Sequence, residues 1–173
     1  MSRDRLRELL EPIYPQVVAF ARHLSRSRTD GDDLYQEAVL RALTKLGQLR
    51  DDAAFRPWLY RIVISIHRNR ERRGFWRRLL PIEATPEPDK GYRDWSAQTA
   101  EAARRAREAL ASLPVDQREA IVLFELEGWT VEEIAALYRV SISAVKSRLA
   151  RGRDRMRQAY DERESLALAE DSP

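Results

Sequence analysis

The segment from Thr130 to Arg157 has the composition of a nucleic-acid contact. Between Arg139 and Gln158 it carries seven basic residues and a single acid, Asp154. On a helical projection one side is apolar, formed by Val145, Leu149, Gly152 and Met156. The opposite side carries Ser143, Ser147, Ala150, Arg151 and Asp154, and it is flanked by Lys146, Arg148, Arg153 and Arg155. Small polar groups between two rows of cations suit a DNA major groove, with base edges in the centre and phosphates on both rims.

On charge alone, this segment could equally be a solvated, arginine-rich surface helix. The residues before it favour DNA. Thr130-x-x-Glu133 is a capping box for a short helix that ends near Leu137, and Ser141 can cap the helix that follows. A short capped helix, a tight connection and a longer basic helix are typical of a helix-turn-helix domain.

A second basic segment runs from Trp58 to Arg78. It has seven arginines from Arg61 onward with Glu71 as its only acid, and aromatic residues lie among or beside them: Phe55, Trp58, Tyr60, Phe75 and Trp76. Cations along a backbone and aromatic faces for bases are typical of single-strand binding. The helical projection predicts Trp58 in the core beside Ile62 and Ile66. It predicts that Tyr60, Ile64 and His67 face outward, with His67 as a hydrogen-bond donor and not a metal ligand.

The acids of Asp32–Glu37 admit three interpretations. Asp33 and Glu37, one helical turn apart, could ligate a metal ion. Acids are also simply favoured at a helix N-terminus, and a polar patch here could dock a protein. No neighbouring residue supplies further ligands or a general base, and the chain has no glycine-rich phosphate loop, GxSxG motif or His pair. We therefore expect neither catalysis, nor a metal, nor a cofactor.

Composition places these segments in a small intracellular protein. The chain has 173 residues, of which 43% are hydrophobic and 34% charged, and it has no cysteine. The longest apolar runs have five residues, so no segment is expected to span a membrane. Acids in the first ten residues argue against a signal peptide. Residues 1–80 carry 17 Lys and Arg against 10 Asp and Glu, and the later residues carry 14 against 18.

Apolar residues recur at intervals of three and four, which predicts an all-α fold of two small helical domains. Pro12 and Pro15 should kink or restart the first helix. Residues 29–33 are interpreted as a turn and cap before a helix that stops near Gly47, and residues 49–54 as a loop before the third helix. Residues 81–99 have three prolines and no apolar period, which predicts a flexible acidic linker.

The rear domain is predicted to begin with an alanine-rich helix from residue 100 that ends at Leu113-Pro114. Asp116-x-x-Glu119 is interpreted as a capping box for a helix reaching Gly128, and the last helix should end near Tyr160. The predicted organisation is therefore a front domain (1–80), a linker (81–99), a helix-turn-helix domain (100–160) and a frayed acidic tail (161–173).

These motifs, in this order, resemble those of bacterial RNA polymerase sigma factors of the extracytoplasmic-function (ECF) group. Residues 33–37 (DLYQE) look like the motif that binds core polymerase, and residues 55–62 (FRPWLYRI) like the promoter-melting segment. Residues 113–119, 132–135 and 145–151 look like the domain that reads the −35 element. Many members carry Asn and Asp where this chain has Ser65 and Asn69, a Gly where Arg139 stands, and a bulkier residue than Ala150.

The resemblance implies a cytoplasmic protein that binds RNA polymerase core and promoter DNA and is not an enzyme; an anti-sigma factor is a further candidate partner. It implies core binding through Asp33, Leu34, Tyr35, Gln36 and Glu37. The predicted −10 contacts are Arg56, Tyr60, Arg61, Ile64, His67 and Arg68. The predicted −35 contacts are Thr130, Ser143, Lys146, Ser147, Arg148, Ala150, Arg151 and Arg155.

Three other functions remain open at this point. A stand-alone helix-turn-helix regulator would use residues 130–157 but leaves residues 30–78 unexplained. A sigma-like decoy would bind an anti-sigma factor and never DNA, against which the basic faces argue. A metal-dependent nuclease, the most distant of these, would use Asp30, Asp32, Asp33 and Glu37.

Overall fold

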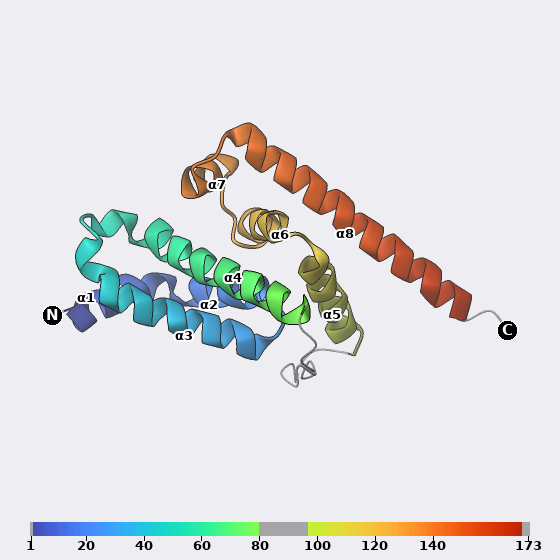
Figure 1. The fold of residues 1–173 in the computed structure, drawn as a ribbon, viewed down its shortest axis with the longest axis horizontal. Helices are drawn as coiled ribbons and strands as arrows, with labels where there is room; N and C mark the ends of the chain where they lie inside the picture. The colour runs from blue at the N-terminus through green and yellow to red at the C-terminus, as the bar shows by residue number, and fades with distance from the viewer. Residues whose placement is uncertain (1, 80–96, 171–173) are drawn as a thin grey trace. The chain divides into compact units, whose positions relative to one another are not determined.

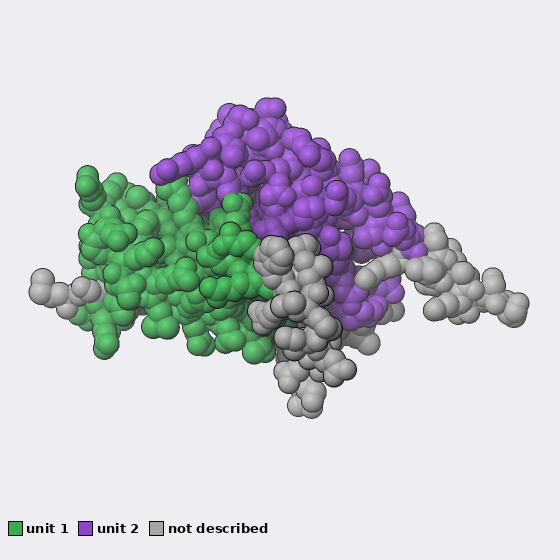
Figure 2. Space-filling model, viewed as in Figure 1, with its two compact units in different colours: residues 1–93 green, residues 94–173 purple. Residues whose placement is uncertain are grey.

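A computed structural model describes residues 2–79 and 97–170, with side chains placed for residues 3–74 and 101–162. The described residues contain helices and no strand, and they belong to two compact units, residues 1–93 and 94–173 (Figures 1 and 2). The predicted all-α fold of two small helical domains is therefore confirmed. The predicted linker lies outside the described residues up to residue 96. Its last three residues, 97–99, belong instead to the first helix of the second unit.

In unit 1 the two early prolines divide the first apolar stripe as predicted. Helix α1 (Ser2–Leu10) is followed by a single 3₁₀ turn, η1 (Glu11–Ile13), which contains Pro12. Helix α2 (Tyr14–Leu24) then begins with Pro15 in its first turn, where a missing N–H has no cost. The stripe itself is buried at Leu6, Val17, Phe20 and Leu24.

Helix α3 (Arg28–Lys45) begins earlier than the sequence pattern indicated. Residues 29–33 lie inside the helix, so their interpretation as a turn is wrong. The cap is Ser27, whose Oγ accepts a hydrogen bond from the backbone N–H of Asp30 at 3.1 Å. Gly31 is buried against α2, and a Cβ at this position would lie 2.5 Å from the Cα of Arg22. The glycine therefore serves the close approach of two helices and not a turn.

Helix α4 (Phe55–Leu79) completes unit 1 and packs along α3 (Figure 1). The connection from α3 is made of two short 3₁₀ turns, η2 (Leu46–Gln48) and η3 (Asp52–Ala54), with Leu49 buried between them. The core beneath α4 includes an offset stack of Phe20 and Tyr60, whose ring centroids are 4.6 Å apart. One side of α4 is thus fully engaged in the core.

Unit 2 consists of α5 (Ala97–Ser112), α6 (Val115–Ile121), a π-helical turn η4 (Val122–Leu126), α7 (Val131–Tyr138) and α8 (Ile142–Glu170). The predicted capping box at Asp116 and Glu119 is wrong. Pro114 is the N-cap of α6 and makes no side-chain cap, while Glu119 is fully buried and accepts a hydrogen bond from the Tyr138 hydroxyl at 3.0 Å. The N-terminus of α6 therefore has no side-chain cap, and the Glu119 carboxylate faces α7.

The last helix continues ten residues beyond the predicted end at Tyr160, as far as Glu170. The predicted frayed tail is therefore helical over residues 161–170, and residues 171–173 lie outside the described residues. The sequence in this stretch is dominated by Leu, Ala and Glu, which are strong helix formers. The acidic residues of this stretch do not end the helix, because it contains neither Gly nor Pro.

The close approach at Gly31 generates a stability prediction. Gly31→Ala should lower the free energy of unfolding by about 1–3 kcal/mol, because the added methyl meets backbone that cannot move aside. Gly74→Ala is the matched control: nothing lies within 4 Å of a Cβ there, and Ala should stabilise α4 by up to about 1 kcal/mol. Urea unfolding of the full chain, followed by circular dichroism, measures both. Equal effects of the two substitutions would contradict the packing role of Gly31.

Candidate nucleic-acid interface

Helices α7 and α8 form the helix-turn-helix that the sequence predicted. The Thr130–Glu133 capping box is complete: Oγ1 of Thr130 accepts from the Glu133 N–H at 3.1 Å, and the Glu133 carboxylate accepts from the Thr130 N–H at 2.8 Å. Arg139 ends α7 in the left-handed region at φ 55°, where the chain turns toward α8. Ser141 then caps α8 by accepting from the N–H of Ala144 at 3.1 Å.

The inner face of α8 packs on α6 through Val145, Leu149 and Gly152, all of them buried. Gly152 makes the closest approach, because a Cβ there would lie 2.9 Å from Cγ1 of Ile121. Met156 is half-buried. The opposite side is exposed at Ser143, Ala150, Arg151 and Asp154, in agreement with the projection. The helix therefore leaves its small and polar face to solvent.

The flanking cations of α8 divide into two kinds. Lys146 and Arg155 are exposed, as predicted for phosphate contacts. Arg153 pairs with Glu125 at 2.6 Å and lies over the ring of Phe124, and Arg151 donates to Oγ of the half-buried Ser147 at 2.7 Å. Both arginines are exposed, although each is engaged by a neighbour within the unit.

Arg148 is more buried than the sequence predicts for a cation that flanks the exposed face of α8. Its side chain is only 23% exposed, its guanidinium lies 5.6 Å from the centre of the Tyr138 ring, and Nε is 3.4 Å from the Asp116 carboxylate. Arg148 therefore connects α8 to α6 and α7 inside the unit, and it is not a fully exposed cation at the edge of α8. Thr130 is exposed, but its hydroxyl is engaged in the capping box.

The predicted −10 face of α4 is wrong in orientation. Tyr60, Ile64 and His67 are buried, at 0%, 5% and 3% exposure, so none of them presents a side chain to a strand. Both α2 and α3 pack against α4, which widens its buried arc beyond a single stripe. Arg61 and Arg68 are exposed, as expected, whereas Arg56 is half-buried over the Tyr60 ring. The side chains of Phe75 and Trp76 lie outside the described residues.

The open side of α4 instead contributes to a basic pocket of about 240 Å³. Trp58, expected in the core, is only half-buried and lines this pocket. The pocket is lined by Arg41, Lys45, Gln48, Trp58, Arg61, Ile62 and Ser65, with no acid among them. Three of these residues come from α3 and η2, which the sequence analysis did not connect with nucleic acid. The signal that could have found them is the pair Arg41 and Lys45, one turn apart at the end of α3.

The residues predicted to bind core polymerase lie on two sides of α3. Leu34 is fully buried and belongs to the core, which corrects its assignment as a contact residue. Tyr35 is half-buried edge-on to Tyr14, with ring centroids 5.6 Å apart, and burial together with Tyr14 raises the pKa of its hydroxyl. Asp33 and Gln36 are exposed and share a surface stripe with Leu40, which is 64% exposed. We call Asp33, Gln36 and Leu40 the α3 stripe.

Glu37, one turn after Asp33 on the same helix, is half-buried and paired with cations of its own unit. Its carboxylate accepts from Arg41 at 3.0 Å and from Arg70 of α4 at 2.8 Å. Asp32 likewise pairs with Arg22 at 2.7 Å. Among the described residues no group of three or more His, Cys, Asp or Glu side chains could hold a metal ion. The acids of a hypothetical nuclease site are therefore not gathered around one point.

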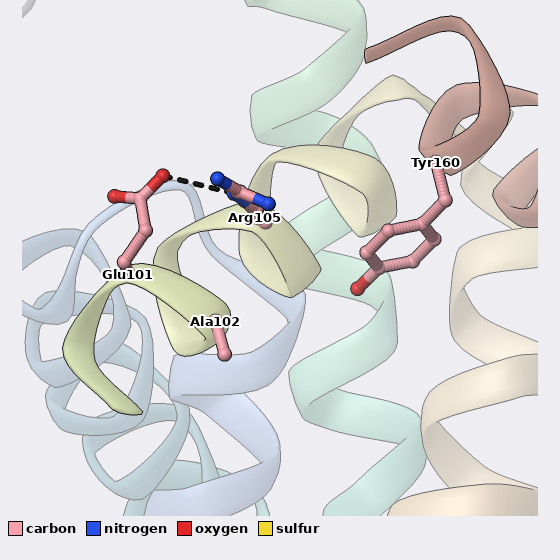
Figure 3. A pocket seen from close by; sticks show the side chains of 4 residues that line it. All are labelled: Glu101, Ala102, Arg105 and Tyr160. Atoms are coloured by element: carbon pink, nitrogen blue, oxygen red, sulfur yellow. Dashed lines mark hydrogen bonds and ion pairs between the residues drawn. The ribbon is translucent and has the colours of Figure 1, made fainter. Parts of the chain in front are cut away.

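A second pocket lies between α5 and α8 within unit 2 and contains none of the predicted site residues. Figure 3 shows Tyr160 facing α5 across it, with Glu101 joined to Arg105 on the other side. Hydrogen bonds from Arg104 and Arg105 lower the pKa of the Glu101 carboxyl to about 2. Glu101 is thus charged at every ordinary pH and satisfied by its own helix.

Comparison with known proteins identifies the family. Residues 9–77 match the model of sigma-70 region 2, and residues 103–156 match that of sigma-70 region 4. The ECF RNA polymerase sigma factor SigM of Mycobacterium tuberculosis is 37% identical over 150 residues, which span 86% of this chain and 74% of SigM. The chain belongs to the ECF sigma factors. Another member, EcfG of Rhodopseudomonas palustris, is 32% identical over 88% of this chain and 83% of its own length.

Solved sigma-factor structures share the fold. The sigma factor RpoE from Bartonella quintana, solved in complex with the anti-sigma factor NepR, aligns with a TM-score of 0.63 at 28% identity, covering 88% of this chain and 94% of its own. CnrH, solved with the cytosolic domain of CnrY, gives the same TM-score at 26% identity over 98% and 91% of the two chains. The protein is thus an RNA polymerase sigma factor. None of its described helices is long and apolar enough to cross a membrane.

The internal position of Arg148 can be tested against its neighbour on the same helix. Arg148→Ala should lower the free energy of unfolding by about 1–2 kcal/mol, through loss of contacts with Tyr138 and of buried side-chain length. Lys146→Ala, on an exposed side chain, should change it by no more than about 0.5 kcal/mol. Both are measured by urea unfolding. If the two variants are equally stable, Arg148 is a surface cation after all.

Proposed function

We propose that this sigma factor divides promoter recognition between its two units. Unit 1 docks on core RNA polymerase through the α3 stripe and holds the melted −10 strand at the basic pocket. Unit 2 reads the −35 duplex with α8. The protein acts in the cytoplasm as a specificity subunit and has no catalytic chemistry of its own, which belongs to the polymerase it directs.

The observation that carries this proposal is the exposed face of α8. It presents Ser143, Ala150 and Arg151 in the centre and Lys146 on an edge, within a helix-turn-helix whose packing leaves that face open. Small central side chains let a helix enter the major groove deeply, and guanidinium groups pair with guanine edges or phosphates. A basic helix without such a central strip would bind phosphates without reading bases.

The basic pocket of unit 1 supports strand capture. Pulling a base from the duplex costs a few kcal/mol, which a stacking surface and nearby cations must offset. Trp58 offers an aromatic face, Arg61 and Lys45 offer cations, and Gln48 and Ser65 offer hydrogen-bonding groups to a base edge. In this proposal these residues take the role that the sequence analysis gave to Tyr60, Ile64 and His67.

The α3 stripe supports docking to a protein. An exposed leucine beside an exposed carboxylate and amide forms a small apolar centre with polar surroundings, as at many interfaces. We also propose an anti-sigma factor as a partner, because the sigma factor RpoE from Bartonella quintana was solved with one. Such a partner would inhibit by covering the same stripe.

Run-off transcription with bacterial core RNA polymerase tests the proposal. The full chain is added to core enzyme on a library of promoter fragments, and transcripts that need both proteins are sequenced. We expect a defined set of promoters with two conserved elements. Duplex binding without transcripts would instead indicate a stand-alone helix-turn-helix regulator, and neither activity would indicate a decoy for an anti-sigma factor.

The α3 stripe generates a prediction on core binding. Asp33→Asn and Leu40→Ala should each weaken binding to core polymerase by about tenfold, as expected for interface residues that contribute over 1 kcal/mol. Glu8→Gln, which removes an exposed acid from α1, should leave affinity unchanged. Fluorescence anisotropy of the labelled chain titrated with core enzyme measures all three. Unfolding curves must match the unsubstituted protein, since these side chains are exposed. Loss of affinity in the Glu8 variant alone would place the docking surface elsewhere.

A further inference from the structure

Ile142 is a large apolar side chain in the first turn of α8, and it is 42% exposed. A single exposed apolar residue carries no meaning by itself. The position of Ile142 makes its exposure informative, because the N-terminal residues of a recognition helix are those that contact base edges in helix-turn-helix proteins. Its neighbours on either side, Ser141 and Ser143, are polar, so the local sequence offers one isolated apolar contact.

The start of α8 does not require an isoleucine at this position. The cap of α8 is made by Ser141, whose hydroxyl accepts from the Ala144 N–H, so Ile142 is not needed to start the helix. β-Branched residues are also poorer helix formers than Ala or Lys. The inner face of α8 packs through Val145 and Leu149, one turn later.

In the major groove, thymine differs from the other bases by its apolar C5-methyl group, and apolar side chains recognise it by contact. We propose that Ile142 reads a thymine methyl in the −35 element and so helps set this protein's promoter preference. Ser143, exposed beside it, offers a hydroxyl to the O4 acceptor of the same or the adjacent base. Lys146, one turn further on, is exposed at the edge of the same face of α8. Its ammonium group would bind a phosphate at the rim of the major groove and hold this end of α8 in place. The inference rests on the proposed reading of the −35 duplex by α8.

The test removes the methyl from the DNA, which leaves the folding of the protein untouched. A promoter found by run-off selection with the holoenzyme is rebuilt with deoxyuridine in place of each −35 thymine in turn. One substitution should lower open-complex formation by about fourfold, the effect of one buried methyl group. The remaining thymines should change it by less than about twofold.

A double-mutant cycle combines the deoxyuridine substitution in the DNA with Ile142→Ala in the protein. This holoenzyme should transcribe the thymine promoter about as weakly as the unsubstituted holoenzyme transcribes the deoxyuridine promoter, and it should lose sensitivity to that one methyl. Leu126→Ala is the matched control: it removes an exposed apolar side chain in the same unit, 50% exposed, that belongs to η4 and not to α8. Its sensitivity to the methyl should equal that of the unsubstituted protein.

The outcomes separate this inference from the function on which it rests. If promoters with a defined −35 element are selected but no thymine methyl is coupled to Ile142, the inference is wrong and the proposed function stands. If no sequence-specific −35 element is selected at all, both fail. Coupling that also appears with Leu126→Ala would mean that the lost sensitivity follows from any weakening of unit 2, and this would overturn the role of Ile142.

Discussion

Both units of this protein depend on a close approach of two helices at a glycine. Gly31 brings α3 against the backbone of Arg22 in α2, and Gly152 brings α8 against Ile121 in α6. Each contact lies on a helix whose other face carries side chains for which we propose a binding role. Because a side chain larger than hydrogen would have to displace backbone or a core residue, the contact fixes which face each helix turns outward. The exposed α3 stripe and the exposed face of α8 are consequences of these two positions.

Some arginines of this protein hold its own helices together and others are exposed to solvent, and a count of basic residues does not distinguish the two groups. Arg70 of α4 donates to the Glu37 carboxylate and to the backbone oxygens of Asp30 and Asp33, so it joins α4 to the N-terminal half of α3. Arg118 is buried and donates to the backbone oxygens of Ala111 and Leu113. Exposed ion pairs contribute little to stability, but an arginine that satisfies carbonyl groups holds elements in place. Cations that brace the fold in this way are less available to a partner.

The existence of the helices was predictable from the sequence, whereas some of their ends and the faces of α4 were not. Apolar periodicity, the two prolines and the Thr130–Glu133 box are local signals, and the structure agrees with each of them. The error at Tyr60, Ile64 and His67 has a tertiary cause: α4 packs on both α2 and α3, so residues on more than one side of its projection are buried. Asp116 and Glu119 have the spacing of a capping box, but that spacing cannot reveal that Tyr138, nineteen residues after Glu119, takes up its carboxylate. The basic pocket could not be predicted from the sequence for the same reason, since it combines side chains from α3, η2 and α4.

The turn before α8 shows how a strained position is maintained next to the surface that we propose for DNA binding. Arg139 adopts a left-handed conformation that costs an L-residue about 1–2 kcal/mol. Its neighbour Tyr138 is held on both sides, by the hydrogen bond to buried Glu119 of α6 and by the guanidinium of Arg148 from α8. Arg148 in turn approaches Asp116 of α6. This chain of polar contacts connects the three helices at the turn, so the surrounding structure over-determines the strained residue, as persistent strain requires. The angle at which α8 leaves the turn is therefore set from within the unit before DNA is met, and a preorganised recognition helix loses less entropy on binding than one that must be ordered by the groove.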